Sequence, residues 1–417
     1  MRNVIRKGVD SYKVCSLLVF NTIVVFAVVN VAIFVAYRVK DGNGLLGRPR
    51  LSNHVVKMYG MPALRGVYPG YKDDDVRLLI KETWDRGLEY DPFTQSKERA
   101  YAGKWVNVHE AGFRLSKNNG PWPPDPKNLN IFLFGGSTTF GYGVADDHTI
   151  ASHLQEFLEC QSGREVKVYN FGSCYFFSSQ ERTRFVNFLA QGVVPDVAIF
   201  IDGLNDFLKD SGKPFFTDAL GKMWDARESS GVVEGILSQL PIKRFSDSIK
   251  ARIALNRQAR ATPNSESYDA SKRLAEVLTL YAQNKHLIEA AARAYDVRPA
   301  FVWQPIPSYH YHLRHYLSDP DKEWLRASTQ VGYTMMGKIV KENPEHYTQD
   351  FLWLADIQEH CTESLYVDSF HYTDKFSNVI AGHIGRFLLK RQIIKDGDTR
   401  RQASKNMAVS RERPVGN

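Results

Sequence analysis

Short apolar runs alternate with amphipathic segments between about residue 126 and residue 390. The apolar runs cover 131–134, 166–169, 197–201 and 300–303, with a weaker run at 351–355. Apolar residues recur at helical spacing in 149–158, 179–190, 269–295 and 375–389. Consecutive apolar residues are typical of strands that are buried on both faces. Strands that alternate with helices therefore predict an α/β fold, a parallel sheet with helices packed on both sides.

A different pattern lies near the N-terminus, where the 24 positions from Val14 to Tyr37 carry no charged residue. A helix needs about 20 apolar residues to cross the hydrocarbon core of a bilayer. The run is longer than the core of a typical secretory signal peptide, and no clean small-x-small cleavage site follows it. It predicts an uncleaved transmembrane signal anchor, with a cleaved signal peptide and a buried helix as the alternatives.

The charges on the two sides of this run are balanced. Four Lys or Arg residues precede it and four follow it: Arg2, Arg6, Lys7 and Lys13, then Arg38, Lys40, Arg48 and Arg50. Because the two counts are equal, the positive-inside rule does not decide the orientation. The free amino terminus adds positive charge before the run. We therefore expect a single-pass membrane protein whose large domain lies on the extracytoplasmic side.

These patterns divide the chain into five parts. A short segment, 1–13, precedes the anchor, 14–37. Residues 38–125 are rich in Gly, Pro and aromatic residues and have few long periodic runs, so we expect a membrane-proximal extension packed on the main domain, with a strand and a turn at 105–114. The main domain is 126–390. The stretch 390–417 carries eight Lys or Arg against three Asp or Glu and few apolar residues, so 391–417 is predicted to be a basic disordered tail.

Composition narrows the class of protein only a little. With 43% hydrophobic and 24% charged residues the chain is globular in type, and much of its net charge of +8 comes from the tail. Elsewhere basic residues are interleaved with acidic ones, so we expect no nucleic-acid partner. The four cysteines form no Cys-x-x-Cys pair, and Cys15 lies in the apolar anchor, so a zinc knuckle is not predicted.

The first strand of the main domain runs directly into a candidate nucleophile. The sequence Asn130-Ile-Phe-Leu-Phe-Gly-Gly-Ser-Thr-Thr-Phe-Gly141 stops an apolar run at two glycines and Ser137, before a helix-like segment. No lysine follows the glycines as it would in a phosphate-binding P-loop. Gly141-x-Gly143 lacks the third glycine of a dinucleotide fingerprint. A hydroxyl on such a turn is well placed for attack, provided that a base activates it.

Groups that such a serine needs follow in order along the chain. Asp368 and His371 lie three residues apart, so the carboxylate can hold the imidazole while the imidazole faces Ser137. Gly172 follows the second strand and can bring a backbone N–H close to a substrate. Asn205 follows the third strand and offers a side-chain amide. With the N–H of Ser137 itself, these are candidate donors to a developing oxyanion.

This order of motifs resembles the SGNH (GDSL-type) hydrolase family. The likeness covers about residues 126–390: Gly-x-Ser after strand one, Gly after strand two, Gly-x-Asn-Asp after strand three and Asp-x-x-His near the C-terminus. It implies a three-layer αβα, flavodoxin-like parallel sheet with no cofactor and no metal. It also implies a nucleophile, Ser137, a base pair, His371 and Asp368, and an oxyanion hole made by Ser137, Gly172 and Asn205. The usual Gly-Asp-Ser reads Gly135-Gly136-Ser137 here, which weakens any inference about the substrate.

An α/β-hydrolase is the nearest alternative, but Thr139 stands where the last glycine of Gly-x-Ser-x-Gly would be. We expect a serine esterase that acts on O-acyl groups, on an envelope or extracellular polysaccharide, with the ester substrate and the membrane as its partners. An O-acyltransferase to a sugar hydroxyl, a lysophospholipase or thioesterase, and a non-catalytic polysaccharide-binding or assembly protein remain as alternatives. His310, His312 and His315 are expected to line a polar groove rather than to bind metal. Tyr175, Phe176 and Phe177 are expected to be core residues, with stacking on a sugar ring as the alternative.

Overall fold

The computed structural model describes residues 2–40, 53–208, 212–229, 242, 266–311, 317 and 323–394. The predicted basic tail beyond 394 and most of 208–268 lie outside the described residues. The chain forms two compact units: Met1–Leu51 with Asp218–Ser267, and Ser52–Thr217 with Tyr268–Asn417. The second unit holds the sheet and every candidate site residue.

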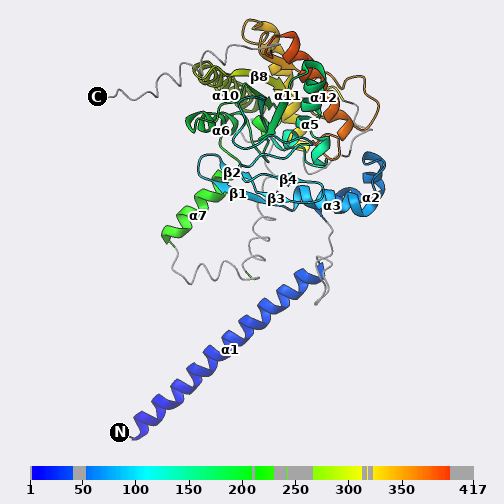
Figure 1. Ribbon diagram of the computed structural model, residues 1–417. Helices are drawn as coiled ribbons and strands as arrows, with labels where there is room; N and C mark the ends of the chain where they lie inside the picture. The colour runs from blue at the N-terminus through cyan, green and yellow to red at the C-terminus, as the bar shows by residue number, and fades with distance from the viewer. Residues whose placement is uncertain are drawn as a thin grey trace, which may run out of the picture. The chain divides into compact units, whose positions relative to one another are not determined.

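The sheet has five parallel strands in the order β6-β5-β7-β8-β9 (Figure 1). Their bounds are β5 Leu129–Gly135, β6 Val166–Asn170, β7 Val197–Asp202, β8 Arg298–Trp303 and β9 Phe351–Trp353. This order is that of flavodoxin-like folds, in which ligands bind at the carboxyl ends of the strands. The predicted α/β class and parallel sheet are confirmed, and the predicted fifth strand exists, although it ends at Trp353.

Each face of the sheet is covered by helices, as the continuous apolar strands required. Phe132 and Phe134 point to one face, where they pack with α6 (Ser178–Ala190), α10 (Glu266–Ala294) and α11 (Glu323–Glu342). Ile131 and Leu133 point to the other face, toward α5 (Ile150–Ser162) and α12 (Asp374–Lys390). Figure 1 shows α6 and α10 on one side of the sheet and α5 and α12 on the other. The architecture is therefore the expected three-layer αβα arrangement.

Residues 53–125 carry more regular structure than the sequence suggested. They form α2 (His54–Val67), α3 (Asp73–Trp84), the antiparallel pair β1 (Leu88–Asp91) and β2 (Gln95–Glu98), and the antiparallel pair β3 (Tyr101–Ala102) and β4 (Asn107–Val108). The expected turn follows β4, and an isolated bridge then joins Arg114 to Asn170 at the end of β6. Residues of α2 and α3 share an apolar cluster with Phe140, Tyr142 and Val367 of the main domain.

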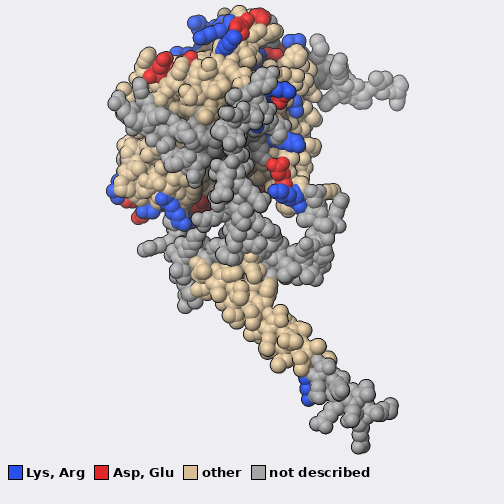
Figure 2. Space-filling model, turned by 180° about the vertical axis from the view of Figure 1, so that it is seen from behind, with Lys and Arg blue, Asp and Glu red and all other residues tan. Residues whose placement is uncertain are grey.

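The N-terminal run forms one helix, α1 (Arg2–Lys40). Its stretch Tyr12–Ala36, 25 residues, is long and apolar enough to cross a membrane, a property that signal sequences near an N-terminus share. Figure 2 shows the described side chains of this helix as an almost uninterrupted uncharged surface. The remaining elements are α4 (Ser137–Phe140), η1 (Asp146–His148), η2 (Asn205–Phe207) and α7 (Thr217–Ser229).

Candidate active site

The nucleophile candidate Ser137 lies on a sharp turn between β5 and the single helical turn α4. Two glycines precede it because neither position has room for a side chain. A Cβ atom on Gly135 would overlap a side chain of α4, and one on Gly136 would overlap the amide nitrogen of Asn205. Gly141 ends α4 in the left-handed region at φ 89°, and its N–H donates to the Ser137 carbonyl oxygen over 3.0 Å. The half-buried Ser137 side chain is thus presented at the carboxyl end of β5.

The structure brings Ser137, His371 and Asp368 into one hydrogen-bonded line. The distance from His371 Nε2 to Ser137 Oγ is 2.8 Å. On the other side of the ring, His371 Nδ1 lies 2.9 Å and 2.8 Å from the two carboxylate oxygens of Asp368. The backbone N–H groups of Phe370 and His371 also donate to Asp368 Oδ1, over 2.9 Å and 2.8 Å. Two side chains 234 positions apart in the chain, Ser137 and His371, therefore meet in the geometry of a nucleophile and its base.

The surroundings of Asp368 keep it ionised. Burial is the largest influence and would raise the pKa of the Asp368 carboxyl. The charge of a protonated His371, the ring hydrogen bond and the two backbone donors together outweigh burial, so the pKa lies below its usual value. The carboxylate is therefore available to orient His371 and to balance positive charge on its ring.

The side chain of Asn205, at the start of η2, lies beside the nucleophile turn. Its Nδ2 donates to the Phe176 carbonyl oxygen over 2.6 Å. The same nitrogen is the atom that a side chain on Gly136 would overlap. Because an amide nitrogen has two hydrogens, one bond to Phe176 leaves the second available next to Ser137.

Gly172 is held differently from what its predicted role requires. Its N–H donates to Asn170 Oδ1 over 3.0 Å, and a Cβ atom at this position would overlap the backbone nitrogen of Phe140. Asn170 Nδ2 in turn donates to the Thr139 carbonyl oxygen over 2.9 Å. The absence of a side chain at Gly172 therefore lets the end of β6 pack directly beneath α4.

Three residues further on, Tyr175 adopts a left-handed backbone with φ 63°, which non-glycine residues rarely do. No group in the described part of the chain accepts the Tyr175 N–H. Its ring stacks on Phe215 with centroids 3.8 Å apart, whereas Phe176 and Phe177 are buried, as expected for core residues. No local pattern predicts this backbone conformation, because tyrosine is not a residue that favours positive φ.

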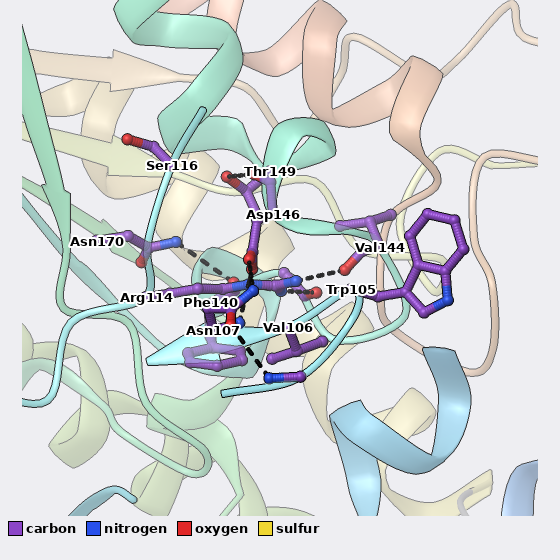
Figure 3. A network of polar contacts seen from close by, with 12 residues as sticks. Trp105, Val106, Asn107, Arg114, Ser116, Phe140, Val144, Asp146, Thr149 and Asn170 are labelled. Carbon is purple, nitrogen blue, oxygen red and sulfur yellow. Dashed lines mark hydrogen bonds and ion pairs between the residues drawn. The ribbon is translucent and has the colours of Figure 1, made fainter. Parts of the chain in front are cut away.

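The nucleophile turn is also held from behind by a buried arginine, Arg114 (Figure 3). Its Nη1 donates to the carbonyl oxygens of Phe140 and Gly141 over 3.0 Å and 2.5 Å, and its Nη2 donates to that of Val144 over 2.5 Å. Its Nε pairs with Asp146 Oδ1 over 2.9 Å. Burial lowers the pKa of Arg114, and the Asp146 carboxylate opposes that effect. One guanidinium thus satisfies the carbonyls at the end of α4, where no helical donor remains.

Three buried carboxyl groups lie beneath the η2 turn. Asp206 accepts from the Ser178 hydroxyl over 2.7 Å and from the Gly203 N–H over 3.4 Å. Burial is the largest effect and raises the pKa of Asp206 to about 6, although these hydrogen bonds act in the opposite direction. Burial and mutual repulsion also raise the pKa values of Asp202 and Glu181 well above the ordinary range. Burial thus favours the neutral form of all three carboxyl groups.

The described residues contain no group of three His, Cys, Asp or Glu side chains that could hold a metal ion. His310 stacks on Tyr309, with centroids 4.0 Å apart, and its Nδ1 lies 3.0 Å from Asp356 Oδ1. His312 and His315 lie outside the described residues. None of the four cysteines forms a disulfide.

A cavity of about 280 Å³ lies on the flank of the loop that carries Asp368. Its walls come from the end of α2 and the residues after it, from Leu79 in the middle of α3, from the loop after α4, from residues 363–367 and from the start of α12. The polar and aromatic lining residues are Tyr68, Tyr71, His148, Glu363, Ser364, Thr373, Asp374 and Lys375. The main domain and residues 53–84 therefore enclose this space together.

No protein-family model matches the chain, and no curated protein matches it. Among solved structures it is similar to a putative lipolytic protein of the G-D-S-L family from Desulfitobacterium hafniense, at 14% identity and a TM-score of 0.34, over 63% of this chain and 100% of that one. It is also similar to a lipase/acylhydrolase from Enterococcus faecalis, at 13% identity and a TM-score of 0.34, over 63% of this chain and 96% of that one. It is similar as well to the esterase EstA from Pseudoalteromonas sp., at 14% identity and a TM-score of 0.33, over 63% of this chain and 98% of that one.

Proposed function

We propose that the chain is an SGNH-type serine hydrolase that cleaves carboxylic esters. The observation that carries this proposal is the hydrogen-bonded line from Asp368 through His371 to Ser137, with 2.8 Å between His371 Nε2 and Ser137 Oγ. A serine hydroxyl is a weak nucleophile, and a positioned imidazole oriented by a carboxylate is what activates it.

The reaction proceeds through an acyl-enzyme. The Ser137 oxygen bonds to the ester carbonyl carbon while its proton moves to His371 Nε2. The tetrahedral intermediate then loses its alkoxide leaving group, which takes that proton from His371 and departs as the alcohol. Water repeats the sequence: His371 takes its proton, the hydroxyl adds to the acyl carbon, and the acid leaves as Ser137 recovers its proton.

The negative oxygen of each tetrahedral intermediate needs donors that are already in place. We assign this role to the Asn205 amide and the Ser137 N–H. For Gly172 to donate as predicted, its bond to Asn170 has to open.

We propose O-acyl groups on an envelope or extracellular polysaccharide as the substrate class. The support is a helix long and apolar enough to span a bilayer, combined with a polar, aromatic-walled cavity beside the catalytic loop. On this proposal the catalytic unit faces the extracytoplasmic side. No metal or organic cofactor takes part.

The test uses the full-length protein in detergent micelles, with a fluorophosphonate probe and p-nitrophenyl acetate. Ser137→Ala should abolish labelling and lower kcat by about 10⁴-fold or more, as the loss of a nucleophile does elsewhere. Ser162→Ala, at the end of α5, is the matched control and should behave as wild type. Equal turnover by wild type and Ser137→Ala, without labelling of wild type, would refute the proposed activity.

The identity of the acyl acceptor needs a second measurement. Product analysis with excess sugar acceptor separates hydrolysis, which releases free acid, from transfer, which yields an acylated sugar. A series of acyl-chain lengths separates a short-chain esterase from a lysophospholipase. Free acid from short-chain esters is the expected result, and acylated sugar as the main product would reassign the protein as an acyltransferase.

A further inference from the structure

Trp84, the last residue of α3, stands against the ring of His371. The two ring centroids are 5.7 Å apart and the planes cross at 84°. Tyr142, which follows α4, stacks on the same imidazole, with centroids 5.3 Å apart and an angle of 22°. Trp84 and Tyr142 also contact each other edge to face, with centroids 5.7 Å apart. The imidazole is thus confined by two aromatic rings at right angles, besides its hydrogen bonds to Ser137 and Asp368.

The position of Trp84 is fixed by anchors on either side of it in the chain. The buried Glu82 carboxylate accepts three backbone N–H groups, from Lys104, Trp105 and Val106, over 2.9, 2.7 and 3.1 Å. Asp85 accepts from the Asn53 side chain over 2.6 Å. Such charge-assisted bonds are stronger than neutral ones, so the end of α3 is held firmly.

The far edge of the indole is fitted to the loop after α4. Gly143 has φ 89°, a conformation that glycine adopts easily, and a Cβ atom there would lie 3.1 Å from Trp84 Cη2. Tyr142 is almost fully buried, and burial, as the largest influence, raises the pKa of its hydroxyl well above the usual value. Tyr142 therefore presents a neutral π face to His371 at any pH at which an esterase would work.

We propose that Trp84 is a positioning residue for His371, and that Trp84 and Tyr142 form an aromatic clamp that holds the imidazole in line with Ser137 and stabilises its protonated form. The clamp matters when His371 carries the proton taken from Ser137, because a cation over an aromatic face is stabilised electrostatically. This inference rests on the proposed esterase function, but it concerns a residue outside the region that resembles SGNH hydrolases.

Other titratable groups face the same ring and its supports. They are Asp368 on the loop of His371, Tyr68 at the end of α2 beside Asp368, Cys174, whose thiol is hydrogen-bonded to the Tyr142 hydroxyl, and the Arg86 and Glu98 pair near Tyr142. Arg86 and Glu98 are ion-paired over 2.6 Å and fully buried, so their opposite charges largely cancel at His371. A pH effect of the clamp is therefore measured with variants that leave all five of these groups unchanged.

Turnover distinguishes positioning from a purely structural role. The full-length variants Trp84→Ala and Trp84→Phe are compared with Trp105→Phe, an aromatic of the same region that makes no ring contact with His371 among the described residues. Rates are divided by the fraction of sites that a fluorophosphonate titrates. Trp84→Ala should lower kcat by roughly ten- to a hundredfold with KM unchanged, since misplacing a catalytic group costs this much. Trp84→Phe should recover most of the loss.

The electrostatic part is tested by Tyr142→Leu, which keeps the site apolar but removes the π face. The acid limb of its kcat/KM profile should move to lower pH by roughly half a unit. A Trp84→Ala enzyme with wild-type kcat per titrated site would overturn the positioning role of Trp84. A Tyr142→Leu pH profile that superimposes on that of the wild type would overturn the stabilisation of the protonated imidazole.

A readout without turnover separates this inference from the proposed function. A protonated imidazole quenches an indole that it touches, so the fluorescence difference between wild type and Trp84→Phe should fall on acidification. In a His371→Gln background that pH dependence should vanish. If it persists unchanged, Trp84 does not rest on His371 and the clamp is wrong, whether or not the protein hydrolyses esters.

Discussion

Asp206 shows how a single buried group makes the η2 turn, which carries Asn205, sensitive to pH. Its carboxyl holds the Gly203 N–H and the Ser178 hydroxyl, while its neighbour Asn205 carries the amide donor. The folded-state pKa of about 6 lies above the ordinary value of 3.8, so between these values the folded state binds a proton that the unfolded state has lost. The contribution of Asp206 to stability is therefore present below pH 4 and is lost as the pH rises through 6.

We therefore expect Asp206→Asn to change the pH dependence of unfolding. Between pH 5 and pH 8 the wild type loses the stability that protonated Asp206 contributes, whereas the variant has no such proton to lose. The Tm of the variant minus that of the wild type should therefore increase over this range. Thermal unfolding at a series of pH values measures this. Asp147→Asn, at an exposed aspartate, should run parallel to wild type. Parallel curves for Asp206→Asn would show that Asp206 does not titrate in this range.

Single residues also mark the limit of what the sequence predicts. Ser137 and Asn205 could be selected because each follows a strand that the local pattern reveals, and Asp368 and His371 because they lie three residues apart. Trp84 could not, since nothing near it in the chain indicates a contact with a residue 287 positions later. Gly172 follows β6, as the pattern predicted, but which atom its N–H faces depends on the Asn170 rotamer.

At the scale of elements, the nucleophile helix α4 is too short to be stable by itself. A single turn forms one or two helical hydrogen bonds, and nucleating a helix is unfavourable. Its geometry is set by β5 before it, by Gly141 after it and by Arg114, whose guanidinium binds the carbonyls of Phe140, Gly141 and Val144. The turn is therefore held by tertiary contacts.

Arg114→Lys should accordingly destabilise the fold and lower activity together. A lysine cannot reproduce the planar fork, so buried carbonyls and Asp146 lose their donors, which costs about 3 kcal/mol or more. Urea unfolding measures the loss. Arg99→Lys is the control, because the Arg99 bond to the Leu88 carbonyl is exposed. A loss below about 1 kcal/mol would mean that other donors replace the guanidinium.

The strands β5 to β8 were predicted within two residues of their bounds, because each is a continuous apolar run. The helices α2 and α3 were not predicted, although α3 carries a signal: Asp73–Asp75 in its first turn and then Val76, Leu79 and Ile80 at helical spacing. In α2, Gly60 interrupts the helical backbone with φ 74°, and Pro62 follows it, which hides the periodicity.

At the scale of the molecule, residues 53–125 belong to the same compact unit as the sheet. They contribute Arg114 behind Ser137, Trp84 against His371 and the Glu98 carboxylate, which accepts the Cys174 N–H over 2.8 Å. Each of these parts of the candidate site is thus braced by a segment that precedes the region resembling SGNH hydrolases. The role of residues 53–125 in supporting the candidate site could not be predicted from local patterns, because each of these contacts joins residues far apart in the sequence.

A chain that begins at residue 126 should therefore not fold into a soluble, reactive protein, whereas a chain that begins at residue 53 should. The shorter chain exposes Phe140, Tyr142 and Val367, which pack on α2 and α3, and leaves the Phe140, Gly141 and Val144 carbonyls without Arg114. We expect it to aggregate or to remain unlabelled by a fluorophosphonate, whereas the longer chain is soluble and labelled. Labelling of both chains at equal rates would show that the segment is dispensable.

The hydrogen bond between Tyr59 and Ser369, over 2.9 Å, joins residues 310 positions apart. Ser369 lies two residues from His371, so the loop that carries Asp368 and His371 is bound to α2, one of the first helices of its unit. Contacts of such sequence separation form late, since the loop between them must first be ordered. During synthesis Ser137 therefore emerges before His371, and on the proposed function the site cannot assemble until His371 has also been made. If Ser137 is the proposed nucleophile, the order of synthesis delays its activation until the unit can fold around it.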